Sequence, residues 1–225
     1  MHSLEKWLLP PRCVLTGELA DITDLSSHVI QTLERPNQVC PRCCEPSLQG
    51  DLCGACLTQP PDFSRTQVGF YFAEPLDKLI YDFKYHQKPS YARLFAELLV
   101  CTLQLDNVEA LIAIPTHPLR RRTRGYNQAE LLAEALGKLL KLPVIKRAVI
   151  RIKHTPSQTH LTSVQRQKNL KNAFQVNPER LTGLSDIALV DDVITTGATM
   201  QQVAELIRKN TSVKNCQAWS VAKTK

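Results

Sequence analysis

Short apolar segments alternate with longer segments of helical apolar spacing over the last three quarters of the chain. Four short segments rich in apolar residues predict strands at residues 66–72, 110–114, 187–190 and 217–221. Three longer segments, in which apolar residues recur every three or four positions, predict helices at residues 91–105, 127–140 and 198–208. Because strands that are apolar throughout are typical of parallel sheets with helices on both faces, the pattern predicts an α/β fold.

The first sixty residues show no such pattern and cannot form a core of their own. Between Leu8 and Asp62 there is no Phe, Tyr or Trp, and large aliphatic residues are sparse around the cysteines. Small modules of this composition need an additional staple, such as a bound metal. Since Pro60 and Pro61 precede the first predicted strand, we predict a cysteine-rich module at residues 1–60 and a second domain at residues 61–225.

Four cysteines in this module have the spacing of a metal site. Two residues separate Cys40 from Cys43 and Cys53 from Cys56, and nine residues lie between the two pairs. Each pair can present two thiolates to one ion, and four thiolates suit tetrahedral Zn²⁺. Disulfides are the alternative, which the reducing interior of a cell disfavours. The spacing therefore predicts a structural zinc site, because four thiolates leave no open position for catalysis.

The predicted strand at residues 187–190 runs into two adjacent carboxylates, Asp191 and Asp192. A loop rich in threonine follows and leads into the helix predicted at residues 198–208. The carboxyl end of a parallel strand is where open α/β sheets bind ligands, and amides at the start of the next helix can hold an anion. The carboxylates could then accept hydrogen bonds from a sugar whose phosphate the loop holds. The alternative is an ordinary helix start preceded by a solvated acidic turn.

The chain is basic, with a formal net charge of +7. Four of the five residues at 120–124 are arginines, and they lie just beyond the predicted strand at 110–114. Their mutual repulsion favours a nearby anion, with a solvated basic turn as the alternative. The glycines lack the spacing of dinucleotide-binding and P-loop motifs. No apolar run approaches a membrane span or a signal peptide, so we expect a cytoplasmic protein without membrane insertion.

Four parts of the sequence resemble the ComF/GntX family. They are residues 9–13 with the cysteines that follow, residues 114–118 with 124–128, residues 155–174, and residues 187–199. The last segment, IALVDDVITTGAT, resembles the motif with which type I phosphoribosyltransferases bind PRPP (5-phosphoribosyl 1-pyrophosphate). One departure is Thr16, which stands where relatives often carry the partner of Cys13 in a further cysteine pair, so we expect no second metal.

The resemblance implies a fold and a process. The fold is a type I phosphoribosyltransferase-like, mostly parallel sheet flanked by helices, with a small N-terminal zinc module. The process is DNA uptake in natural transformation (competence).

The resemblance also implies roles for individual residues. Asp191 and Asp192 would contact the ribose hydroxyls of PRPP, which binds with Mg²⁺. The residues that would hold its 5-phosphate are Thr195, Thr196, Gly197, Ala198 and Thr199. The residues that would hold its pyrophosphate are Thr116, His117 and Arg124. The polar run at residues 155–174 lies where type I enzymes place a mobile lid, and its candidate residues are Gln158, Arg166 and Asn169.

Three functions agree with these features. The first is Mg²⁺-dependent transfer of a phosphoribosyl group from PRPP, or a related ribose phosphate, to an acceptor that the sequence does not identify. The second is a non-catalytic protein of the DNA-uptake machinery that senses PRPP or binds single-stranded DNA. Basic charge favours DNA, whereas aromatic residues, 6% of the chain, do not interleave with the basic runs and indicate no stacking platform. In the third, an apolar surface on residues 1–60 docks other DNA-uptake proteins.

Overall fold

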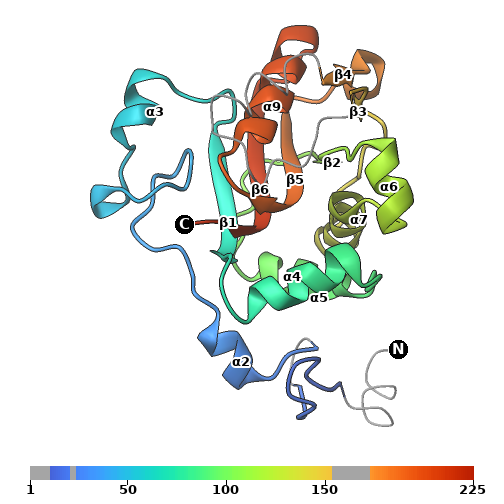
Figure 1. Ribbon diagram of the computed structural model, residues 1–225. Coiled ribbons are helices and arrows are strands. Elements are labelled where there is room, and N and C mark those ends of the chain that lie inside the picture. Colours follow the sequence, from blue (N-terminus) through green and yellow to red (C-terminus); the bar gives the residue numbers. More distant parts are fainter. Residues whose placement is uncertain (1–10, 21–23, 154–172) are drawn as a thin grey trace.

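The computed structural model of the chain describes residues 11–20, 24–153 and 173–225 (Figure 1). A four-stranded sheet in the order β1-β6-β5-β2 forms its centre. The strands are β1 (Arg65–Tyr71), β6 (Asn215–Lys223), β5 (Asp186–Ile194) and β2 (Ala110–Ala113). All three pairings are parallel, which confirms the predicted α/β class with a mostly parallel sheet.

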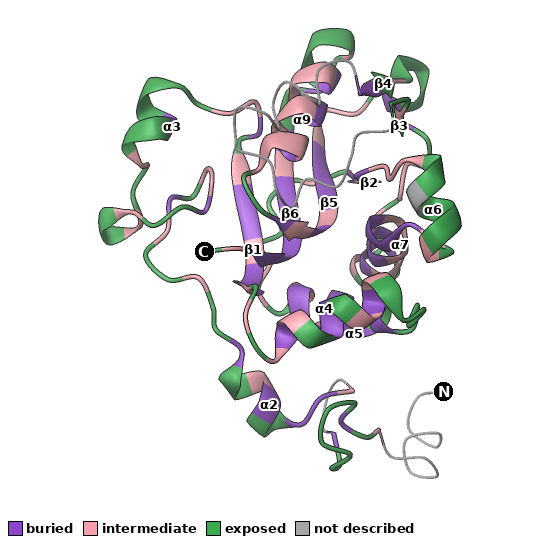
Figure 2. Cartoon of the chain, viewed as in Figure 1, coloured by how far each residue is buried: buried purple, intermediate pink, exposed green. Residues whose placement is uncertain are grey.

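Helices cover both faces of this sheet, so its strands are buried on both sides (Figure 2). One face packs against α4 (Leu76–Tyr85), α5 (Tyr91–Val100) and α7 (Gln128–Leu140), and the other packs against α9 (Ala198–Asn210). Ala188 and Val190 of β5 enter the first core, whereas Ile187 and Leu189 enter the second. Burial on both sides explains why this strand is apolar at successive positions.

The helix predicted at residues 91–105 ends early, at Val100. Gln67 of β1 provides the physical reason. Its side-chain oxygen accepts a hydrogen bond from the Gln104 N–H at 2.7 Å, and its side-chain nitrogen donates to the Gln104 carbonyl at 2.9 Å. These bonds satisfy the Gln104 backbone outside a helix, a long-range contact that local apolar spacing cannot reveal.

The apolar pattern also leaves several elements unpredicted. They are α4, α6 (Pro118–Arg124), and an antiparallel pair of strands, β3 (Val149–Arg151) and β4 (Phe174–Val176). The chain further forms 3₁₀ turns at Leu48–Gly50 and Pro178–Leu181. No helix within the three described ranges combines the length and the apolar character needed to cross a bilayer.

The predicted N-terminal module is built from two differently placed parts. Residues 24–33, which include α2 (Ser27–Thr32), contribute Leu25 and Val29 to the same core as α5. Residues 34–60, which include α3 (Gly54–Thr58), lie beside β1 instead (Figure 1). The domain boundary near residue 60 remains a prediction.

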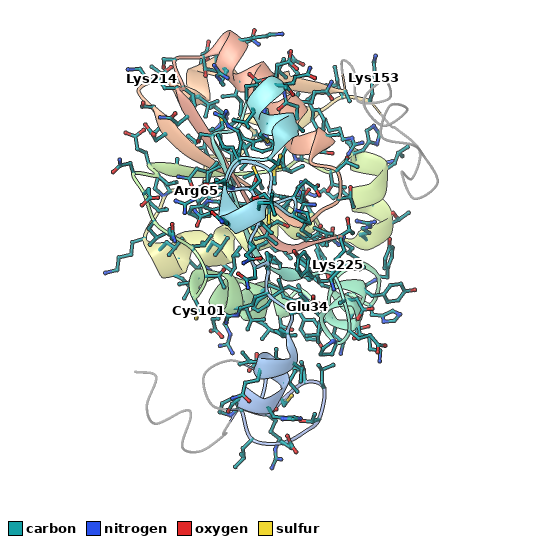
Figure 3. The ribbon with its side chains drawn as sticks, turned by 90° about the vertical axis from the view of Figure 1, so that its left-hand side faces the viewer. Glu34, Arg65, Cys101, Lys153, Lys214 and Lys225 are labelled. Atoms are coloured by element: carbon teal, nitrogen blue, oxygen red, sulfur yellow. The ribbon has the colours of Figure 1, made fainter. Side chains whose placement is uncertain are left out.

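Backbone hydrogen bonds tie this second part to the edge of the sheet. The Thr66 N–H donates to the Pro41 carbonyl at 3.0 Å, and the Tyr71 N–H donates to the Glu34 carbonyl at 2.7 Å. The Glu34 side chain also pairs with Lys225 at 2.7 Å, near the C-terminus (Figure 3). Residues 34–45 therefore cover β1, an edge strand whose polar groups would otherwise face solvent.

The chain leaves β2 and β5 toward opposite faces of the sheet. After β2 it forms α6 and then α7, whereas after β5 it forms α9 on the other face. The β2 ladder ends with the pair Ala113 and Val190, while β5 continues to Ile194. A crevice therefore opens between the carboxyl ends of β2 and β5, at the kind of switch point where open α/β sheets bind ligands.

Candidate functional site

A cavity of about 180 Å³, here called the aspartate cavity, occupies this crevice. Asp191 and Asp192 of β5 line it together with Thr116, Arg124 and Thr199. These five residues come from two segments far apart in sequence, and the family resemblance assigns all of them to one ligand. The remaining lining residues are Lys84, Ile114, Pro115, Asn127, Gln128, Ala129 and Arg151.

The two aspartates differ in their partners. Asp192 is buried, and its Oδ2 lies 3.0 Å from Lys84 Nζ of α4. Its Oδ1 accepts a hydrogen bond from the Val193 N–H at 2.8 Å. Asp191 is half-buried, and its Oδ1 accepts a hydrogen bond from the Asp192 N–H at 2.9 Å. Lysine and backbone amides thus fix the carboxylates at the cavity wall.

Burial and the neighbouring carboxylate raise the pKa of Asp191. Removal from solvent is the larger cause and the negative charge of Asp192 adds to it, whereas Lys84 acts in the opposite sense. The net effect raises the pKa of Asp191 from 3.8 to about 8. An acid that is reluctant to ionise is poised to respond to a cation or to hydrogen-bond donors.

The threonine-rich loop turns sharply between β5 and α9. Gly197 caps the helix with a φ of 71°, a left-handed conformation that glycine adopts without strain. Thr199 faces the aspartate cavity, whereas Thr196, Gly197 and Ala198 line a separate cavity of about 600 Å³ that also touches the cysteine-rich segment. Thr195 is exposed. The residues predicted to hold the 5-phosphate are therefore contiguous in the loop but face two hollows.

The segment after β2 holds the residues predicted to bind pyrophosphate. Thr116 donates from Oγ1 to Asn127 Oδ1 at 3.0 Å, which fixes it at the cavity wall. His117 caps α6, because its Nδ1 accepts a hydrogen bond from the Leu119 N–H at 3.2 Å. The Arg124 guanidinium lies 5.0 Å from the centre of the Tyr85 ring and donates to its hydroxyl at 3.2 Å. Thr116 and Arg124 thus line the aspartate cavity, and His117 is not among its lining residues.

Four polar residues that line the aspartate cavity were not predicted from the sequence. They are Lys84, Asn127, Gln128 and Arg151. Asn127 and Gln128 fall within the 124–128 segment that carries the family resemblance, so the signal for them was present. Lys84 and Arg151 lie in α4 and β3, which the apolar pattern does not predict. The predicted lid residues Gln158, Arg166 and Asn169 lie outside the described residues.

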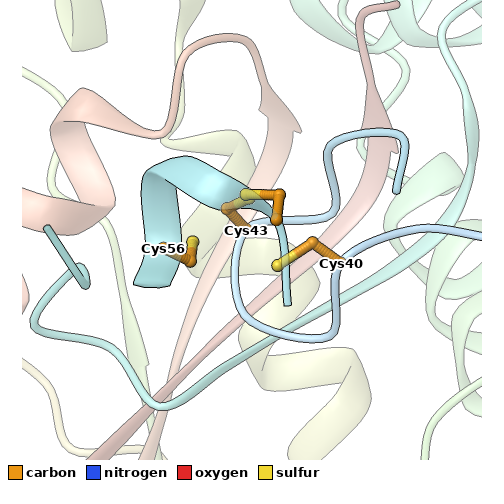
Figure 4. A group of neighbouring side chains, drawn as sticks. Cys40, Cys43 and Cys56 are labelled. Carbon is orange, nitrogen blue, oxygen red and sulfur yellow. The ribbon is translucent and has the colours of Figure 1, made fainter. Parts of the chain in front are cut away.

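The four predicted metal ligands converge beside β1 (Figure 4). The Sγ atoms of Cys40, Cys43, Cys53 and Cys56 all lie within 4.8 Å of one another. Such a cluster has the number and kind of donors of a closed tetrahedral site, so these cysteines could hold one metal ion. Cys44 is also buried but does not belong to the cluster.

The local backbone prepares this cluster for a cation. Burial works to raise the pKa of Cys40, but hydrogen bonds from the backbone N–H groups of Cys53, Cys43 and Arg42 lower it to about 6. Burial raises the pKa of Cys43 and that of Cys56, the latter to about 11. Cys40 is therefore ready to ionise, whereas Cys43 and Cys56 require a positive ion to do so.

Comparison with known proteins agrees with the resemblance. The chain is 38% identical over 179 residues to competence protein F of Haemophilus influenzae, which covers 76% of this chain and 78% of that protein. It is 32% identical over 194 residues to DNA utilization protein YhgH of Shigella flexneri, with 83% and 84% coverage. It is 27% identical over 117 residues to competence protein ComFC of Streptococcus pneumoniae, with 52% and 50% coverage. No family model matches the chain. Identity at this level over three quarters of both chains shows that this protein belongs to the ComF family.

Proposed function

We propose that this protein binds PRPP with Mg²⁺ in the aspartate cavity and serves the uptake and use of DNA. The names of its relatives, competence protein F and DNA utilization protein YhgH, support the second half of this proposal. One observation carries the first half. Asp191, Asp192, Thr116, Arg124 and Thr199 line a single cavity at the switch point of a parallel sheet.

Each wall of this cavity suits a different part of PRPP. Carboxylate oxygens of Asp191 and Asp192 accept hydrogen bonds from ribose hydroxyls. Thr199 and the loop before it donate to the 5-phosphate, with help from the helix start. Arg124 and Thr116 face the pyrophosphate. Adjacent carboxylates also fit Mg²⁺, a cation that prefers oxygen ligands and is often shared with substrate phosphates.

The chemistry that we propose is phosphoribosyl transfer. The bond between ribose C1 and the pyrophosphate oxygen breaks, the acceptor nucleophile forms a bond to C1 and loses its proton, and pyrophosphate departs. When bound, Mg²⁺ supplies positive charge to the departing pyrophosphate. Arg124 adds a second positive charge, and the two carboxylates hold the ribose so that C1 keeps its orientation.

Calorimetric titration of the full, metal-loaded chain with PRPP, with and without Mg²⁺, tests this proposal. We expect binding that requires Mg²⁺ and that weakens at least about tenfold in Thr199→Val, which removes one directed hydrogen bond to an anion. Thr182→Val, an exposed threonine outside the cavity, is the matched control. Release of pyrophosphate with a panel of bases and amines then separates an enzyme from a PRPP sensor. Absence of PRPP binding by the wild-type chain would refute the proposal.

A second candidate function, binding of single-stranded DNA, gains support from an aromatic cluster on α4. Tyr81 and Tyr85 are 53% and 54% exposed, and their ring centres lie 4.8 Å apart. The His86 ring lies 5.3 Å from Tyr81, and Arg124 covers Tyr85 from α6. Exposed rings beside arginine can stack on unpaired bases. The sequence indicated no such platform because α4 and α6 meet only in the folded chain.

We further propose that the four-cysteine cluster holds structural zinc and that the protein works in the cytoplasm, where thiols stay reduced. Four converging sulfur donors support zinc over harder cations, which prefer oxygen.

Leu48 and Leu57, at 89% and 66% exposure, offer an apolar surface on the same module for other DNA-uptake proteins. Replacing both leucines with serine should reduce DNA uptake by cells while zinc content stays unchanged. Unchanged uptake would argue against the docking role.

A further inference from the structure

A further cavity, of about 600 Å³, adjoins the aspartate cavity. The two cavities share Pro115, Thr116, Asn127 and Arg151, so they are contiguous. The volume of the second lies within the range of about 300–1,000 Å³ that is usual for small-molecule sites. A ligand in it would lie directly beside whatever the aspartates hold.

Apolar side chains form much of its wall. They come from β2 and from the segment that leads into β3, and they include Ile112, Val144, Val149 and Ile150. Transfer of an apolar ligand surface from water to such a wall is favourable by roughly 25 cal/mol per Å². This wall therefore suits a ligand with an organic ring rather than a bare inorganic anion.

Positive charge surrounds that wall. The cationic lining residues are Arg121, Arg122, Lys146, Arg147 and Arg151, whereas Glu130 is the one acidic residue that lines it in the described part of the chain. Arg121 pairs with Glu130 at 3.4 Å, and Lys146 pairs with Glu134 at 2.6 Å. Neither Arg122 nor Arg147 forms an ion pair with any residue of the described ranges. Two guanidinium groups thus remain available to a ligand, and guanidinium matches carboxylate and phosphate geometry.

We propose that this second cavity, here called the ring cavity, binds the acceptor, and that the acceptor is a flat ring that carries a carboxylate or a phosphate. The inference rests on the proposed PRPP site, since the shared wall places an acceptor next to the ribose. Pyrophosphate alone would leave the apolar wall unused, and a neutral base would leave Arg122 and Arg147 without a partner. The two features together specify an anionic ring.

Matched probes test this assignment in the full chain. Uracil has the ring alone, acetate has the anion alone, and orotate and phenyl phosphate have both. We expect orotate or phenyl phosphate to bind at least about tenfold more tightly than uracil or acetate, the gain of one charge-assisted hydrogen bond. Arg122→Gln and Arg147→Gln should each remove most of this gain, and Ile150→Gln should weaken both ring-bearing anions but not acetate. Lys138→Gln, an exposed lysine of α7 outside the cavity, should change nothing.

The outcome separates this inference from the proposal on which it rests. Arg122 and Arg147 do not line the aspartate cavity, so their replacement should leave the affinity for PRPP with Mg²⁺ unchanged. Failure of PRPP to bind the wild-type chain would refute the PRPP site, whatever the ring cavity does. PRPP binding together with equal affinities for acetate and both ring-bearing anions would overturn the acceptor assignment, and so would weaker or absent binding of both ring-bearing anions.

Discussion

Lys84 of α4 places its Nζ 3.0 Å from Asp192 Oδ2, and both side chains are largely removed from solvent, at 21% and 10% exposure. Removing one partner of a buried ion pair leaves an uncompensated charge, which costs more than the pair itself contributes. We predict that Lys84→Met lowers the free energy of unfolding by about 2–3 kcal/mol, somewhat less than a fully buried pair would. Denaturant titration followed by circular dichroism measures this loss.

The same helix provides the control. Lys78 pairs with Glu74 at the same distance of 3.0 Å, but the two side chains are 65% and 72% exposed. Lys78→Met should therefore leave the free energy of unfolding almost unchanged, because exposed ion pairs contribute little to stability. Equal losses in Lys84→Met and Lys78→Met would contradict a buried pair at the cavity.

The four-cysteine cluster predicts a stoichiometry. Protein purified without chelator should contain one zinc per chain, and Cys56→Ser should lose it, because three sulfurs do not close the tetrahedron. Cys44→Ala removes a neighbouring buried thiol that lies outside the cluster and should keep the metal. Elemental analysis of the three proteins decides between these outcomes, and a zinc-free Cys44→Ala would show that the ligand set is wrong.

The raised pKa of Asp191 predicts a pH-dependent gain in stability when this residue is neutralised. Because its pKa rises from 3.8 to about 8 on folding, the folded state holds the proton more tightly than the unfolded state. The stability that this proton contributes is complete below 3.8 and is lost as the pH rises to about 8. Asp191→Asn avoids that loss, so it should stabilise the protein by on the order of 2 kcal/mol at alkaline pH and little in acid.

Thermal unfolding in Mg²⁺-free buffer at acid and alkaline pH measures this difference. For a chain of this size, each kcal/mol shifts the melting temperature by about 2–4 °C. Asp51→Asn, on the exposed surface, should give no such pH-dependent gain. A constant offset of Asp191→Asn at all pH values would mean that folding does not shift the pKa of Asp191.

The aromatic cluster on α4 predicts how DNA binding should respond to mutation. If single-stranded DNA stacks on this cluster, Tyr81→Leu and Tyr85→Leu should each weaken binding on the order of tenfold, since stacking on one ring contributes about 1–3 kcal/mol. Phe72→Leu alters an exposed aromatic residue just after β1 and should have no effect. Fluorescence anisotropy with a labelled oligonucleotide measures the affinities.

Salt provides an independent check on the same contact. Binding should fall linearly in a plot of log affinity against log salt, with a slope of about −0.7 for each phosphate contacted. Arg124→Gln should make that slope shallower by about one contact. A flat response to salt would dismiss DNA as a partner of this surface.

Residues of β5 illustrate how far the sequence alone could lead. Its apolar run was sufficient to predict a buried strand, because burial on both faces imposes the pattern directly, whereas the ligand site at the two aspartates after Val190 stays a prediction. The strand is longer than predicted and includes Asp191 and Asp192, since pairing with β6 continues to Ile194. Polar residues inside a strand do not contribute to the apolar pattern, so this pattern could not show where β5 ends.

The cysteine cluster could also be predicted from the sequence, because the spacing of its ligands is a local pattern. Lys84 and the Tyr81–Tyr85 pair could not be predicted from the sequence. They belong to α4, a helix with a polar exposed face. Their proposed roles depend on the packing of α4 beside the aspartates and α6. Long-range proximity of this kind has no counterpart in local spacing. The same limit applies to the shortened α5, which Gln67 ends from a neighbouring strand.

The cover that residues 34–45 provide for β1 would link binding of a metal at the four cysteines to solubility. The four-cysteine cluster begins at Cys40, within the same stretch of chain that covers the edge strand β1. Removal of a bound ion would therefore loosen this cover and expose unpaired backbone amides and carbonyls of β1. Open rows of that kind recruit strands from other molecules. Protein treated with a chelator should then aggregate before its helices and inner strands unfold.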